Sequence, residues 1–132
     1  MGKKYLIDSN VLIEYVGNLF PEPIQSSLSA ILDDSFTISF INKVEILGHH
    51  SVDEAWRGFV NQASIIAPDE DIIEQTIQLR IQHKIKIPDA IIAATALVND
   101  LTLLTRNVAD FKKVSNLKVQ NPWLWNAAPD IS

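Results

Sequence analysis

Four acidic side chains spread along the sequence have the chemistry needed to bind a divalent metal ion. Asp8 and Asp110 each follow a short apolar run that is typical of a strand. Glu45 lies inside an apolar stretch, and Asp89 opens the segment 90–98, which is apolar on nearly every side. A carboxylate buried near a core costs roughly several kcal/mol unless something neutralises it. Because Mg²⁺ and Mn²⁺ prefer oxygen ligands, these acids predict a site for a hard divalent cation.

Five runs of the sequence have the apolar or alternating pattern of strands, and helical patterns lie between them. The runs are 5–7, 36–40, 65–67, 101–105 and 117–120. Strands that alternate with helices predict a mostly parallel sheet covered on both faces. We therefore expect an α/β fold: a single-domain, three-layer α/β/α sandwich around a mostly parallel central sheet of four to five strands.

Caps and apolar stripes place the helices. Asn42 is expected to cap the helix that carries Glu45. Asp89 is expected to begin the apolar helix that continues over 90–98. Another helix is expected to turn Ile73, Ile77 and Ile81 toward the core, because they recur every four residues. Strand carboxyl ends and helix N-termini meet at one edge of such a sheet, so the four acids are expected to converge there.

Length and composition limit the possible classes of protein. The 132 residues predict one domain over 1–132, with a core at about 4–122 and a C-terminal tail at 123–132. The absence of cysteine excludes disulfides and favours the reducing cytoplasm. No apolar run approaches the roughly 20 residues that span a bilayer, so no membrane is expected. The net charge of −5 argues against a broad basic face, although a nuclease can be acidic if its metal ions meet the phosphate.

Four segments around these acids resemble, in order, the motifs of PIN-domain ribonucleases. They are 6–13 (LIDSNVLI), 43–48 (KVEILG), 88–97 (PDAIIAATAL) and 103–111 (LLTRNVADF). Within that family the chain is most similar to the VapC-type toxins of type II toxin–antitoxin pairs. No single motif is specific, but the four together, at compatible spacing in a chain of this length, make a strong signal.

The resemblance implies a Mg²⁺- or Mn²⁺-dependent endoribonuclease with an RNA substrate and a small antitoxin protein as partner. It also implies a homodimer or a toxin–antitoxin hetero-oligomer. One departure concerns the last motif, in which many members carry Asp two residues after the Thr. Here that position is Asn107, and the acid comes later, at Asp110. The sequence therefore leaves open which of the two completes the site, and whether one metal ion binds or two.

Each polar residue of the motifs can be given a predicted role. Asp8 and Asp89 are assigned as direct metal ligands, Glu45 as the holder of a metal-bound water, and Asp110 or Asn107 as the completing group. These four acids form the predicted catalytic set. Metal-activated water would hydrolyse the RNA phosphodiester bond, with no need for a histidine base.

Short hydroxyl and amide side chains beside the acids are expected to orient them. Ser9, Asn10 and Thr105 are the candidates for this role. Arg106 is expected to contact an RNA phosphate.

Other interpretations compete with the nuclease. A single Asp at the end of a strand is most often a turn or helix cap, and Asp110 in particular is equally well explained as a cap. Asn107 keeps open a catalytically silent PIN-like module that binds RNA or protein. An aspartyl phosphotransfer protein fits poorly, because such chains carry a second acid close to the first, where Asn10 stands here.

Overall fold

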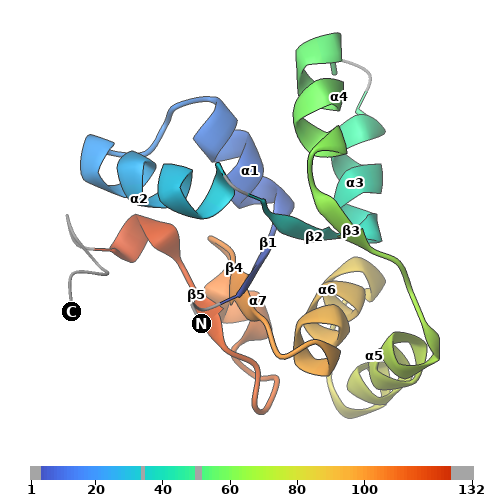
Figure 1. Ribbon diagram of the computed structural model, residues 1–132. Helices are drawn as coiled ribbons and strands as arrows, with labels where there is room; N and C mark the ends of the chain where they lie inside the picture. Colours follow the sequence, from blue (N-terminus) through green and yellow to red (C-terminus); the bar gives the residue numbers. More distant parts are fainter. Residues whose placement is uncertain (1–3, 34, 50–51, 126–132) are drawn as a thin grey trace.

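The computed structural model describes residues 4–33, 35–49 and 52–125. Strands and helices alternate along most of this part of the chain (Figure 1). The strands are β1 (Tyr5–Ile7), β2 (Thr37–Ser39), β3 (Ser64–Ile66), β4 (Thr102–Leu104) and β5 (Val119–Gln120). The helices are α1 (Ser9–Val16), α2 (Glu22–Leu32), α3 (Phe40–Leu47), α4 (Glu54–Asn61), α5 (Glu70–Gln82), α6 (Ile87–Val98), α7 (Val108–Phe111) and the 3₁₀ helix η1 (Pro122–Leu124). Within the described ranges, no helix has the length and apolarity to cross a bilayer.

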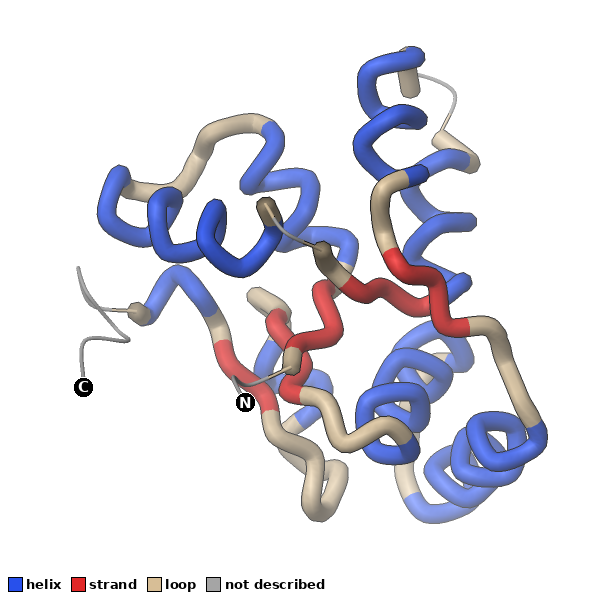
Figure 2. The backbone as a smooth tube through the Cα atoms, viewed as in Figure 1, coloured by secondary structure: helices blue, strands red, loops and turns tan. Residues whose placement is uncertain are grey.

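The strands form one sheet in the order β3-β2-β1-β4-β5, and all pairs are parallel (Figure 2). In the central pair, Leu6 lies beside Leu103 and Ile7 beside Leu104. The predicted α/β fold with a parallel sheet is thereby confirmed. The connections between parallel strands need crossovers, and helices supply most of them.

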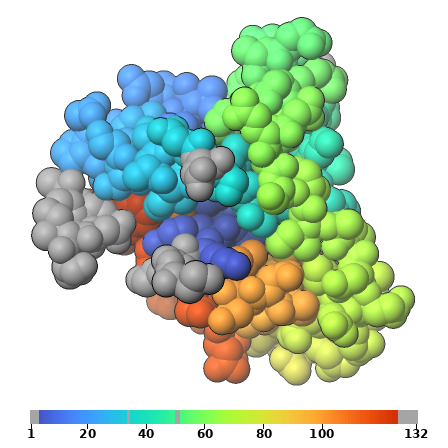
Figure 3. All heavy atoms as spheres, in the orientation of Figure 1, coloured from blue at the N-terminus to red at the C-terminus, as the bar shows by residue number. Residues whose placement is uncertain are grey.

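Successive residues of the strands point to opposite faces, so the sheet has a separate apolar core on each side. Leu6 and Leu103 pack with side chains of α5, α6 and α7. Ile7 and Leu104 pack with those of α1 and α2, together with apolar residues of α3 and α4. Figure 1 shows α1 and α2 on one side of the strands and α5 and α6 on the other. In Figure 3, α4 forms a lobe that projects from this body.

Two predicted helix starts are wrong by two to three residues. The side chain of Ser39, not of Asn42, caps α3, since its Oγ accepts a hydrogen bond from the Ile41 N–H at 3.2 Å. Asn42 completes a capping box with Ser39, because its Oδ1 accepts a hydrogen bond from the Ser39 N–H at 3.0 Å. Helix α6 begins at Ile87, so Asp89 lies within its first turn and is not its cap.

The predicted inner stripe of α5 is also wrong. Ile73, Ile77 and Ile81 are exposed, and the helix buries Ile72 and Leu79 instead. These two side chains lie seven residues apart and pack in the core that contains α6. A helix with isoleucines on two faces offers two stripes of similar period, and only the position of the neighbouring helix selects one of them.

The register of α5 can be tested by comparing two adjacent isoleucines. Ile72 is 1% exposed and Ile73 is 43% exposed. Ile72→Ala should lower the free energy of unfolding by about 2–5 kcal/mol, because it leaves a cavity in the core. Ile73→Ala should change it by only about 0.5 kcal/mol. Urea unfolding followed by circular dichroism measures both, and equal losses would contradict this register.

Candidate metal centre at the carboxyl edge of the sheet

The candidate site lies where β1 and β4 run side by side at the centre of the sheet. After β1, the chain adds β2 and β3 on one side of β1, and then β4 and β5 on its other side. The point at which the order of strands reverses therefore lies between β1 and β4. Asp8 directly follows β1, and its N–H donates to the Leu104 carbonyl at 2.9 Å. Ligand sites of parallel sheets occur beyond the carboxyl ends of strands at this kind of switch point.

The Asp8 carboxylate is nearly buried and is held by four hydrogen bonds. Oδ1 accepts from the Ser9 N–H at 2.8 Å and from the Asn42 amide at 3.2 Å. Oδ2 accepts from the Thr105 hydroxyl at 2.8 Å and, more weakly, from the Asn10 amide at 3.4 Å. The donors come from α1, α3 and the end of β4. They fix the orientation of the carboxylate from three directions.

Burial controls the protonation of Asp8. Its side chain is 7% exposed, and the loss of water raises its pKa, although the hydrogen bonds from Thr105, Ser9, Asn42 and Asn10 oppose this effect. All four of these donors are neutral groups. They stabilise the negative charge without cancelling it, so an added cation has a favourable place to bind.

The second acid, Glu45, is connected to Asp8 through one residue. The hydroxyl of Ser9 donates to Glu45 Oε1 at 2.8 Å, while the Ser9 N–H binds Asp8. Glu45 projects from α3 and is exposed. The structure thus places Ser9 between the two acids, with its backbone on one and its side chain on the other.

Asp89 is half-buried and lies in the field of the other three acids. Burial is the largest cause of its raised pKa, and the negative charges of Asp8, Asp110 and Glu45 raise it further. The positive charge of Lys86 opposes these effects. Asp8, Asp110 and Glu45 therefore lie near enough to Asp89 for their charges to act on it, although the four acids come from separate segments.

The remaining two candidates, Asn107 and Asp110, are exposed. The Asn107 N–H donates to the Thr105 hydroxyl at 3.1 Å, so its backbone belongs to the network around Asp8. Its side chain makes no capping bond to α7. Asp110 lies in α7 and shares a cavity with Asp89. Both residues are exposed to solvent, whereas Asp8 is buried.

The donor chemistry of these residues fits a hard divalent cation. Asp8 supplies carboxylate oxygens whose hydrogen-bond donors are all neutral, and Asp89 supplies oxygens whose pKa is raised although Lys86 opposes the rise. In the part of the chain that the structure describes, no three His, Asp or Glu side chains gather closely enough to hold an ion by themselves. Mg²⁺ retains several waters and often uses only one or two protein carboxylates, so Asp8 with Asp89 is a sufficient protein contribution.

Two parts of the site were missed by the sequence interpretation. Asn42 is fully buried and donates to both Asp8 Oδ1 and the Ser9 hydroxyl, the latter at 3.0 Å. Its place in a helix that follows β2 would have been a signal, since β2 pairs with β1. The other part is Glu14, a buried acid in α1, which the sequence pattern does not distinguish from a surface residue.

Glu14 changes the expected role of Arg106. The Arg106 guanidinium forms an ion pair with Glu14 Oε2, and the Trp123 indole N–H donates to Oε1 of the same carboxylate at 2.8 Å. The Arg106 N–H donates to the Asn10 side chain at 3.1 Å. Since Asn10 and Glu14 are four residues apart in α1, they lie on one face of the helix and bind Arg106 by its backbone and its side chain. The positive charge expected to meet RNA is therefore already paired.

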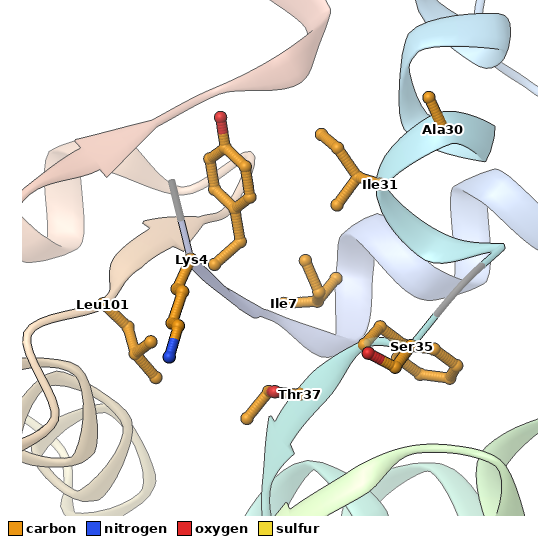
Figure 4. Close-up of a pocket in the computed structure, with 9 residues that line it drawn as sticks. Lys4, Ile7, Ala30, Ile31, Ser35, Thr37 and Leu101 are labelled. Carbon is orange, nitrogen blue, oxygen red and sulfur yellow. The ribbon is translucent and has the colours of Figure 1, made fainter. Parts of the chain in front are cut away.

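A separate cavity lies at the opposite edge of the sheet, where the strands begin. It measures about 480 Å³, and Figure 4 shows Lys4, Thr37 and Leu101 among the residues around it. None of the four acids lines this cavity. The four candidate acids lie at the carboxyl edge of the sheet, so this cavity is not the candidate active site.

Comparison with known proteins identifies the family. The sequence model of the PIN domain matches residues 5–117. Among curated proteins the chain has no match.

Solved structures also resemble this chain. A chain of a toxin–antitoxin complex from Klebsiella pneumoniae is 32% identical, with a TM-score of 0.72, over 90% of this chain and 98% of that one. A chain of VapBC-1 from nontypeable Haemophilus influenzae is 26% identical, with a TM-score of 0.71, over 89% and 97%. A chain of DNA-bound VapBC from Salmonella typhimurium is 19% identical, with a TM-score of 0.74 over 92% and 99%, and shows the shared fold.

Neutralising Asp89 should stabilise the metal-free protein. The raised pKa means that the folded state holds the Asp89 proton more tightly than the unfolded state does. Its contribution to stability is therefore complete below the ordinary value of 3.8 and is lost as pH rises through the folded pKa. Asp89→Asn should remove this loss and raise the melting temperature in EDTA at neutral pH by a few degrees.

Thermal unfolding in EDTA at pH values from about 4 to about 8 measures this effect. Asp100→Asn is the matched control, because Asp100 is exposed and pairs with Lys118 away from the site. A lower melting temperature for Asp89→Asn than for the wild type at neutral pH would show that the Asp89 charge is not under repulsion.

Proposed function

Since the chain belongs to the PIN-domain family, we propose that it is a Mg²⁺- or Mn²⁺-dependent endoribonuclease and the toxin of a type II toxin–antitoxin pair. The observation that carries this proposal is the buried Asp8 carboxylate, held by neutral donors from three elements beside the repelled carboxylate of Asp89. An oriented Asp8 carboxylate, near enough to Asp89 to raise its pKa, at the carboxyl edge of a parallel sheet suits a divalent ion and a phosphodiester.

Asp8 and Asp89 would hold the ion, and the exposed Glu45 and Asp110 would hold water around it. When bound, the ion offsets the charge of the phosphate and lowers the pKa of water at the site. Asn42 and Thr105 keep the Asp8 carboxylate in one orientation, so its oxygens need no rearrangement when substrate binds. Ser9 sets Glu45 relative to Asp8.

The reaction supported by this arrangement is hydrolysis of the RNA backbone. Water adds to the phosphorus, the bond from phosphorus to the 3′ oxygen breaks, and a water proton ends on that oxygen. The products are a 5′-phosphate and a 3′-hydroxyl. The four hydrogen bonds to the Asp8 carboxylate come from a backbone N–H, two side-chain amides and a hydroxyl, and we assign the proton transfer to the carboxylates and the water that they would orient.

The partner proposal rests on the similar solved structures. Those from Klebsiella pneumoniae and Haemophilus influenzae are complexes of a toxin with its antitoxin. We extend this to the present chain as a small antitoxin protein that binds it within a hetero-oligomer. The acids of the candidate site would attract a basic side chain of such a partner, which would compete with the metal ion.

RNA cleavage tests the nuclease directly. The wild type should cut a structured RNA pool in Mg²⁺ or Mn²⁺ and lose this activity in EDTA. Asp8→Asn should lower the rate by at least about 100-fold, because an amide cannot supply the same charge to the ion. Asp100→Asn should keep full activity, since Asp100 lies outside the site and its positive φ of 52° suits asparagine.

Activity that is equal in the wild type and Asp8→Asn would contradict the carboxylate mechanism. If neither protein cuts RNA, calorimetry with Mn²⁺ decides between two explanations. Binding that disappears in Asp8→Asn would mean a metal centre with a selective substrate. No binding by either protein would favour a silent PIN-like binding module.

Co-expression tests the antitoxin proposal. A short reading frame directly upstream of this gene, encoding a DNA-binding protein, should yield a product that co-purifies with the chain and suppresses its RNA cleavage. Size-exclusion chromatography with light scattering would give the mass of the complex. An upstream product that neither co-purifies nor inhibits would remove the toxin–antitoxin role and leave the nuclease proposal intact.

A further inference from the structure

A second cavity beside the acids differs from them in charge. It measures about 170 Å³ and is lined by Lys84, Ile85, Lys86, Asp89, Asp110 and Lys113. Three lysines and two acids of the candidate site thus line one cavity, in a protein whose net charge is −5. We call this cavity the lysine pocket. It shares Asp89 and Asp110 with the acidic site, so a ligand that extends from one site reaches the other.

The segment that carries two of these lysines is held in place. Residues 84–86 connect α5 to α6, and Ile85 between the lysines is buried in the core. The Arg80 guanidinium donates to the Ile85 carbonyl at 2.5 Å. Both the side chain and the carbonyl of Ile85 are therefore held in place. Lys84 and Lys86, on either side of it, are exposed.

The third lysine joins this segment from across the pocket. Lys113 follows α7, and its ammonium group donates to the Lys84 carbonyl at 2.6 Å. An ammonium group has three protons, so this bond leaves two of them for another acceptor. The contact brings the end of α7 and the connection between α5 and α6 together, with positive charge from both.

An RNA-binding surface needs cations near the cut, because the RNA backbone is negatively charged. Arg106 is paired with the buried Glu14, and its backbone is bound by Asn10. The lysine pocket includes Asp89, and among the described residues none of its three lysines forms an ion pair. Lysine binds phosphate as a compact point charge, and several together suit an anion with oxygens in many directions.

We propose that Lys84, Lys86 and Lys113 bind an RNA backbone phosphate adjacent to the one that is cut. This rests on the proposed nuclease function and gives the direction in which the RNA strand leaves the acidic site. An internal phosphodiester is favoured over a free or terminal phosphate, because two acids of the candidate site line the pocket, so an RNA backbone held there passes beside them. The role is substrate positioning, so loss of Lys84 or Lys113 weakens binding, while loss of Lys86 also removes the positive charge that lowers the pKa of Asp89.

Binding of a labelled single-stranded RNA by fluorescence anisotropy tests the proposal without requiring cleavage. Asp8→Asn is used as the common background so that the RNA stays whole. Adding Lys86→Gln with Lys113→Gln should weaken binding about ten-fold at low salt. The slope of log affinity against log salt should become shallower by about 1 to 1.5. Lys118→Gln in the same background is the control, since Lys118 is exposed and pairs with Asp100.

Equal binding by the double variant and the Lys118 control would overturn the proposal. An effect seen only with RNA that carries a 5′-phosphate, and absent with a 5′-hydroxyl, would also overturn it in favour of a terminal-phosphate site. Loss of RNA binding in the double variant, together with a wild type that cuts no RNA, would keep the phosphate site and remove the nuclease. In an active enzyme, Lys113→Gln alone should raise KM and leave kcat within about two-fold, whereas Lys86→Gln should also raise the pKa of Asp89.

Discussion

The burial of one carboxylate determines how the rest of this structure is arranged. Asp8 lies at the end of the central strand β1, where both faces of the sheet are covered and little water reaches it. An ion in such a place has to be surrounded by donors. The chain provides them from the start of α1, from α3 and from the residue after β4. The geometry of each of these elements is thus tied to the same pair of oxygens.

The order of the strands makes this arrangement possible. Because β1 lies between β2 and β4, the helix after one neighbour and the loop after the other both reach its end. Asn42 enters from the first side and Thr105 from the second. Asp89 arrives independently, in the first turn of the helix that covers the opposite core. Asp8 and Asp89 therefore approach the same edge of the sheet from elements that pack in different cores. Their mutual repulsion is opposed by the packing of those elements.

Local patterns in the sequence were enough to predict the parallel sheet and the position of Asp8, since a short apolar run followed by a polar residue is a local signal. Features that depend on contacts between elements distant in the sequence were not predictable in this way. The choice between Ile72 and Ile73 depends on where α6 lies, and the use of Asn42 depends on the pairing of β2 with β1. The burial of Glu14 could not be predicted, because it depends on Arg106 and Trp123, which bind its carboxylate from distant parts of the sequence. The lysine pocket depends on the path of three residues between helices, which no periodicity describes.

The contact between Glu14 and Trp123 links the order of synthesis to the assembly of the site. The two residues are 109 positions apart, and Asp8 is 97 positions from Thr105. A ribosome makes the N-terminal partners first, so both acids exist for most of translation without the groups that complete their surroundings. Contacts of such long range also carry the cost of closing a long loop, as does the pairing of β1 with β4. The acidic edge can therefore be complete only after the C-terminal part of the chain has been made.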